Sequence, residues 1–170
     1  MKNVFYLSLL VILFSSCQKQ QKIGFVDNGE VINNYQEKLD VEAKFKKKDE
    51  VFQKKTDSIS KAFQLEAQDF QLKSKSMSQS QAQEKYDELG QKQQYLRQQL
   101  QFEQQQLQQQ FNVEIDSVIS RVREYVSDYG KKNGYTYILG KNEAGSVLYG
   151  TEDNDLTKTI TDALNAEYKK

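Results

Sequence analysis

The architecture expected for this chain follows from two long runs, residues 39–74 (LDVEAKFKKKDEVFQKKTDSISKAFQLEAQDFQLKS) and 81–129 (QAQEKYDELGQKQQYLRQQLQFEQQQLQQQFNVEIDSVISRVREYVSDY). None of the 170 residues is proline, so no proline interrupts a helix. At the helical rise of about 1.5 Å per residue the runs would be roughly 50 and 75 Å long. Helices of this length exceed a compact domain, so we predict a projecting antiparallel helical hairpin.

Each run carries a narrow apolar stripe at steps of three, four or seven residues, the spacing of one helix face. The stripe of the first run is Val41, Phe45, Phe52, Ile59, Phe63, Ala67, Phe70 and Met77. That of the second is Leu89, Leu96, Leu100, Leu107, Phe111, Ile115, Val118, Val122, Tyr125 and Tyr129. From Phe111 onward the steps alternate between four and three, as in a coiled coil. Such a stripe is most often a buried seam; alternatively, its phenylalanines bind apolar material.

Residues 74–80 separate the two runs and are rich in serine and lysine. Within this break, Ser78 followed three residues later by Gln81 matches a capping box, which predicts the start of the second helix. Gly90 lies inside that helix and is expected to cost it roughly 1 kcal/mol.

The composition argues against several classes of function. The chain has 24 basic and 24 acidic residues, no histidine and one cysteine. It therefore lacks the usual zinc ligands, the catalytic triads that need histidine, and an intrachain disulfide. No glycine-rich phosphate-binding motif is present. We predict no enzymatic activity, no metal, no cofactor and, because the net charge is zero, no nucleic-acid binding. The lysines at 46–48 and 54–55 fit a solvated helix face better than a polyanion site.

The N-terminal residues have the features of an export signal. Lys2 precedes an apolar segment at 4–14, and two small serines follow at 15–16. We predict a signal peptide over residues 1–16 that is removed after export.

The single cysteine, Cys17, follows those serines directly. The sequence FSSC at 14–17 resembles a bacterial lipobox, in which the cysteine thiol is lipidated. We therefore predict a lipidated tether over residues 17–21, a periplasmic location and a membrane anchor, in the outer membrane rather than the inner one. The alternative is a plain signal peptide with an incidental cysteine.

The two ends of the mature chain carry strand patterns. Residues 22–27 and 135–139 alternate apolar and polar side chains, and residues 146–149 are expected to return as the second strand of a β-hairpin. Short helices are predicted over 30–35 and 157–168.

These ends, 22–36 and 131–170, form a small body, and residues 37–130 form the arm. Three strands with few apolar side chains and open edges are marginal alone, which favours self-association. The residues assigned to the body core or a subunit interface are Ile23, Phe25, Val26, Tyr137, Leu139, Val147 and Tyr149.

Several motifs together resemble the OmpH/Skp family of periplasmic chaperones. They are KIGFVD at 22–27, VINNY at 31–35, the Gln/Lys-rich hairpin and KNGYTYIL at 132–139, with VLY at 147–149 and DLT at 155–157. The resemblance implies an α+β, predominantly helical fold whose β body is completed by trimerisation and whose hairpin arms enclose a cavity. It implies an ATP-independent holdase for unfolded outer-membrane β-barrel proteins. Such relatives are often basic, so no lipopolysaccharide site is transferred to this balanced chain.

Weak, distributed contacts suit a disordered client that must later leave. The candidate client-binding residues are Phe45, Phe52, Phe63, Phe70, Phe102 and Phe111. A different hypothesis is a structural coiled-coil lipoprotein that tethers or spaces envelope layers. It predicts that all of these phenylalanines are buried between the two helices, whereas a holdase needs several of them exposed.

Overall fold

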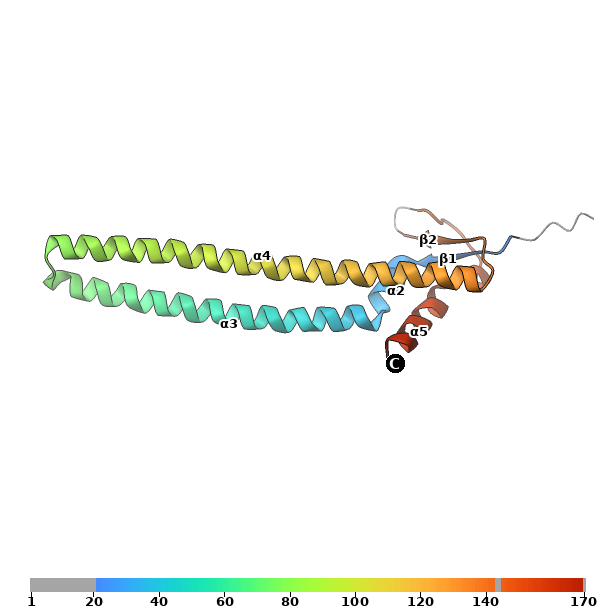
Figure 1. Cartoon of the computed structure of the whole chain (residues 1–170), viewed down its shortest axis with the longest axis horizontal. Coiled ribbons are helices and arrows are strands. Elements are labelled where there is room, and N and C mark those ends of the chain that lie inside the picture. The colour runs from blue at the N-terminus through green and yellow to red at the C-terminus, as the bar shows by residue number, and fades with distance from the viewer. Residues whose placement is uncertain (1–20, 143–144, 170) are drawn as a thin grey trace, which may run out of the picture.

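A computed structural model describes residues 21–142 and 145–169 of the chain. In chain order its elements are β1 (Ile23–Asp27), α2 (Asn28–Asn34), α3 (Gln36–Lys73), η1 (Ser74–Ser76), α4 (Gln79–Lys132), β2 (Tyr137–Lys141), η2 (Glu152–Asn154) and α5 (Thr157–Tyr168). Figure 1 shows α3 and α4 side by side as a long arm, with the remaining elements gathered at one end. The predicted α+β, predominantly helical fold is confirmed. The predicted signal peptide and Cys17 lie outside the described residues.

The arm is an antiparallel hairpin of 38 residues in α3 and 54 in α4. The break between the two helices is a single 3-10 turn, η1, followed by extended backbone at Met77. The predicted capping box starts α4. The Ser78 hydroxyl accepts from the Gln81 N–H at 3.3 Å, and the Gln81 Oε1 accepts from the Ser78 N–H at 3.2 Å. These bonds satisfy backbone donors that the first helical turn would otherwise leave free.

The sheet consists of two parallel strands, β1 and β2. Their register pairs Ile23 with Tyr137, and Phe25 with Leu139. On the other edge of β1, the Phe25 carbonyl accepts from the Leu156 N–H at 2.8 Å, and the Asp27 N–H donates to the Thr157 hydroxyl at 2.9 Å. Both edges of β1 are therefore occupied.

The predicted β-hairpin after β2 is wrong, because residues 145–149 form no strand. The chain instead crosses the ring of Phe25 at Gly150, where an added Cβ would lie 2.3 Å from the ring. Further along the chain, Asp155 forms an isolated parallel bridge with Phe25, at the edge of β1 that faces away from β2. The segment that contains Val147 and Tyr149 therefore leads across the sheet to the far edge of β1, and does not pair along β2.

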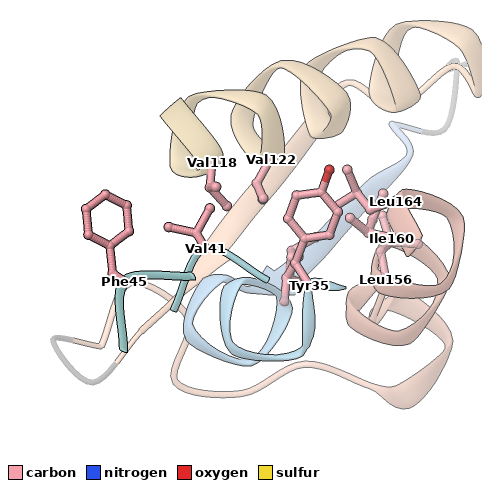
Figure 2. Close-up of a cluster of buried hydrophobic side chains, with 10 residues drawn as sticks. Tyr35, Val41, Phe45, Val118, Val122, Leu156, Ile160 and Leu164 are labelled. Atoms are coloured by element: carbon pink, nitrogen blue, oxygen red, sulfur yellow. The ribbon is translucent and has the colours of Figure 1, made fainter. Parts of the chain in front are cut away.

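One hydrophobic core joins the body to the base of the arm (Figure 2). Its buried members are Val26, Val31, Tyr35, Val41, Phe45, Val118, Val122, Leu156, Ile160 and Leu164. The core crosses the boundaries predicted at residues 37 and 130, because α3 and α4 contribute their first and last turns to it. The arm is therefore anchored by the same packing that holds α5 and β1 together.

Close backbone approach explains one glycine of the first strand. A Cβ on Gly24 would lie 2.7 Å from the Leu156 Cδ1 and 3.0 Å from the Tyr135 Cε1. A contact of 2.7 Å is shorter than real Cβ atoms make, so any larger residue at this position would displace the Leu156 side chain that packs against β1.

Candidate functional site

The phenylalanines at the base of the arm hold the two helices together. Phe45 and Phe52 are 6% and 7% exposed. The ring of Phe45 packs edge-to-face on that of Phe111, with centroids 5.3 Å apart and an interplanar angle of 67°. This contact closes the hairpin just above the shared core, where Phe45 lies beside Val41 and Val118 (Figure 2). These side chains serve the seam within one chain.

The other candidate phenylalanines differ in exposure. Phe63, Phe70 and Phe111 are half-buried along the seam, whereas Phe102 is 61% exposed. Among the six predicted residues, Phe102 alone is largely open to solvent. The stripe therefore supplies mostly the seam, and other side chains must provide most of any apolar binding surface.

Ion pairs between the helices mark one side of the hairpin. The Lys55 Nζ lies 2.5 Å from the Glu103 Oε2, and the two residues line the same groove of about 460 Å³. The other ion pairs between the two helices are Lys44–Glu114 at 2.7 Å, Lys92–Glu66 at 2.5 Å, Lys85–Glu66 at 3.8 Å and Arg121–Glu37. Lys44–Glu114, Lys55–Glu103 and Lys92–Glu66 are 11 residues apart on both helices, and the other two pairs continue the series at steps of seven residues, so all of them lie on the same side. We call this the ion-pair side.

The opposite side, which we call the far side, has a separate groove of about 420 Å³. It is lined by Glu42, Phe45, Lys46, Asp49, Gln104, Leu107, Gln108 and Phe111. Among the described residues of the arm, no ion pair joins the helices on this side. The pairs on the ion-pair side are exposed to solvent, and each contributes little to the free energy of folding. On that side, the hydrogen bond from the Lys92 ammonium lowers the pKa of Glu66.

A row of exposed residues on α4 lies outside the predicted stripe. Its members follow each other at steps of four and three, and all are exposed: Tyr95, Gln99, Phe102, Gln106, Gln109 and Val113. We call it the α4 row. Gln106 lines the groove of the ion-pair side, so helical spacing places the whole row toward that side. The exposed fractions of Tyr95 and Val113 are 64% and 59%.

A matching set of exposed apolar residues lies on α3. Val51 lines the same groove as Gln106, and Leu65 and Leu72 follow it after 14 and 7 residues. We call these three the α3 row. Since Lys55 faces Glu103 across the seam, the apolar members of the two rows follow one another along roughly 40 Å of the arm. Val51 lies at the groove of the ion-pair side, and helical spacing turns Leu65 and then Leu72 from that side toward the outer face of α3. One side of the hairpin therefore presents a broken apolar surface that the stripe alone did not predict.

A signal for the α3 row is present in the sequence. Val51, Leu65 and Leu72 are separated by 14 and 7 residues, which are multiples of a heptad. Each stands one position before a member of the heptad series that begins with the seam residues Phe52 and Ile59. This is a flanking position of the heptad. Apolar residues at flanking positions, in addition to the central stripe, are therefore the pattern from which the row could be predicted.

The residues predicted for the body divide into two sets. Val26 is buried in the shared core, Phe25 is buried on the other face of β1 against Gly150, and Val147 is half-buried. The others are exposed on the described chain: Ile23 at 43%, Leu139 at 45%, Tyr137 at 58% and Tyr149 at 86%. Ile23, Tyr137 and Leu139 lie on the outer face of the sheet, next to the edge of β2 that pairs with no strand among the described residues; we call it the open edge. An exposed apolar sheet face with an open edge is a surface that other chains can cover.

The described residues contain no group of acidic, cysteine or histidine side chains that could hold a metal ion. Among the described helices, none combines the length and apolar character needed to span a bilayer.

Comparisons with known proteins agree with this geometry. The model of a protein family described as outer membrane protein (OmpH-like) matches residues 22–164. The crystal structure of a candidate outer membrane chaperone (OmpH-like) from Caulobacter crescentus CB15 superposes with a TM-score of 0.77 at 14% identity. The superposition covers 87% of this chain and 86% of that one. At this identity the similarity shows a shared fold. No curated protein matches the chain.

Proposed function

Because the chain belongs to the OmpH-like outer membrane protein family, we propose that it is an ATP-independent periplasmic holdase for unfolded outer-membrane β-barrel proteins. The similar fold of a candidate outer membrane chaperone supports this assignment. The observation that carries the proposal is the exposed apolar surface formed by the α3 and α4 rows on one side of the arm.

The spacing of this surface suits a client that must stay unfolded. Single apolar side chains such as Phe102 and Leu65 are separated by polar residues, so each contact is small and many client sequences can satisfy it. Many weak contacts along roughly 40 Å hold a flexible chain without requiring one bound conformation. Release then needs no nucleotide, because no single contact is strong.

We propose further that three copies assemble through the sheet and that their arms surround the client. The exposed Ile23, Tyr137 and Leu139 and the open edge of β2 support self-association. In such an assembly the α3 row and the α4 row would line the space between the arms. The α4 row includes Phe102, the exposed member of the six candidate phenylalanines. The spacer hypothesis requires all six candidate phenylalanines to be buried between the helices, and of these only Phe102 is largely exposed. What favours the holdase is therefore the exposed apolar side chains of the two rows, which a spacer does not need.

We also propose that the chain is anchored to a membrane through a lipidated Cys17, with no catalytic role of its own. The mass of the mature protein purified from membranes tests the anchor. An acylated N-terminal cysteine is expected, and an unmodified mature chain would contradict it. The holdase proposal does not depend on this result.

The holdase is tested by diluting a urea-unfolded outer-membrane β-barrel protein into buffer with the purified oligomer. Light scattering should be suppressed by the wild type, and suppressed less by the double variant Tyr95→Ser, Phe102→Ser. Removing two exposed aromatic side chains should weaken binding roughly 5-fold to 30-fold, because the lost apolar contact is worth about 1–2 kcal/mol.

The matched control is Tyr86→Ser. Tyr86 is 66% exposed, and its spacing of 18 residues from Gln104 places it on the far side. This variant should suppress aggregation as well as the wild type. Scattering that is unchanged by the wild-type protein would remove the proposed function. Equal loss in both variants would remove the assignment to the ion-pair side.

A further inference from the structure

We infer that the glutamines of the α4 row bind main-chain amide groups of an extended client segment, while Tyr95, Phe102 and Val113 contact its apolar side chains. The inference rests on the proposed holdase function and names the chemistry that the arm recognises. The preferred ligand is an extended peptide segment without charge, about as long as the row.

The α4 row is free of charge in a chain that is otherwise highly charged. Acidic and basic residues make up 28% of the sequence, yet none occupies the six positions of the row between residues 95 and 113. The corresponding positions of α3, between Val51 and Leu72, include Lys55 and Asp69. A charged face would select clients of opposite charge. An uncharged face of hydrogen-bonding side chains selects the group that all polypeptides share, the main-chain amide.

The row glutamines are available for this role. Gln108 donates to Asn112 at 3.0 Å, and Gln110 accepts from Lys48 at 3.2 Å. The side chains of Gln99, Gln106 and Gln109, by contrast, have no hydrogen-bond partner among the described residues, and all three are exposed. Each therefore offers two N–H donors and a carbonyl acceptor to a ligand.

The arrangement of the row matches an unfolded chain. Each residue of an extended segment carries one main-chain donor and one acceptor, and side chains that alternate in direction. Gln99 and Gln106 flank Phe102 at steps of three and four, so a segment whose apolar side chain packs on Phe102 brings its amides near both glutamines. Because water satisfies the same amides in the free client, the net gain per bond is small and the complex stays reversible.

The length of the row limits the segment that it can hold. From residue 95 to residue 113 the helix rises roughly 27 Å. An extended peptide of about eight residues covers that distance. This is close to the roughly 9–11 residues of one transmembrane β-strand, a segment type with alternating apolar side chains and little charge.

The test uses the full mature oligomer and two fluorescent peptides of about ten residues. One is uncharged, with valine and threonine alternating; the other has the same sequence with alternate amides N-methylated, which removes those N–H donors. Anisotropy titration should show roughly 3-fold to 10-fold weaker binding of the methylated peptide to the wild type, the effect of one or two lost hydrogen bonds.

The decisive comparison is between two triple variants of α4. Gln99→Ala, Gln106→Ala, Gln109→Ala should weaken binding of the unmethylated peptide and abolish the difference between the peptides. Its control, Gln101→Ala, Gln104→Ala, Gln108→Ala, removes three exposed glutamines from other faces of the same helix and should behave like the wild type. Alanine has the higher helix propensity, so neither set weakens α4.

The outcomes separate this inference from the proposed function. If the two triple variants bind both peptides alike while the wild type still suppresses aggregation, the row glutamines are only solvated and the inference is wrong. If the row variant instead changes the mass of the oligomer, a second copy of the chain covers the row, and the inference is also wrong. If the wild type neither binds peptide nor suppresses aggregation, the proposed function itself fails.

Discussion

Tyr35 shows how a single side chain joins three elements at the base of the arm. It is 4% exposed, and its ring packs edge-to-face on Tyr168 of α5, with centroids 5.9 Å apart. In Figure 2 its hydroxyl points toward α4. Burial, and then the nearby Glu37 carboxylate, raise the pKa of Tyr35 well above its ordinary value of 10.0. A hydrogen bond to Asp40 at 3.0 Å raises the pKa of Tyr168 in the same direction.

The raised pKa of Tyr35 predicts a loss of stability in alkali. A group whose pKa is higher in the folded state stabilises the fold below its unfolded pKa and loses that contribution as the pH rises toward the folded value. The thermal midpoint of the wild type should therefore fall between about pH 9 and pH 11. Tyr35→Phe should show a shallower fall over the same range, because only Tyr125 and Tyr168 still contribute raised pKa values. Identical slopes for the two proteins would contradict this account.

At the scale of the element, α4 combines strong and weak local features over 54 residues. Its start is held by the capping box of Ser78, and its last turns are packed into the core through Val118 and Val122. Between them lies Gly90, which is exposed and has no atom within 4 Å of the position that a Cβ would take. Nothing in the structure requires glycine at this position.

Replacing Gly90 by alanine is expected to stabilise the chain by about 1 kcal/mol, because glycine loses more backbone entropy in a helix. Urea unfolding followed by circular dichroism, at one fixed protein concentration, measures the change. Gly24→Ala is the contrasting control. Its Cβ would meet the Leu156 side chain at 2.7 Å, so this variant should be less stable than the wild type. A destabilised Gly90→Ala variant would indicate a role for backbone flexibility in the middle of α4.

For the whole molecule, the arm and the body have unequal support. The arm is anchored by the shared core, but the sheet of the described chain has only two strands, and its outer face leaves Tyr137 and Leu139 exposed. Isolated two-stranded sheets are marginal in water. Assembly of several copies would cover this face and place the arms around a common space.

Leu139→Lys is therefore expected to dissociate the proposed oligomer. A lysine on the outer face of β2 would carry an unpaired charge into a contact between copies, which costs several kcal/mol when it is desolvated. Analytical ultracentrifugation at micromolar concentration should show a trimer for the wild type and smaller species for the variant. A control substitution at the arm, Leu72→Lys, should leave the mass unchanged. A wild-type chain that stays monomeric and folded would contradict the proposed assembly.

Features that depend on neighbouring residues along the chain can be predicted from the sequence alone. The two arm helices, their capping box at Ser78, the β1 strand and α5 are all of this kind, because helical periodicity and capping are local properties of sequence. The stripe phenylalanines are also visible in the sequence, but their division between seam and surface is not. Phe45 lies on the predicted stripe and Phe102 lies beside it, so periodicity separates these two, whereas the extent to which Phe52 is buried and Phe63 is half-buried depends on the partner helix.

By itself, therefore, the sequence of this protein determined which segments are helical and that they pair as a long hairpin. The tertiary structure decided the rest: that β1 and β2 are parallel, that residues 145–149 form no strand, and that one side of the arm holds the ion pairs and the exposed rows. The physical reason is that strand pairing and the orientation of a helix face depend on contacts between residues far apart in the chain, whereas helix formation and capping depend on residues within a few positions of each other.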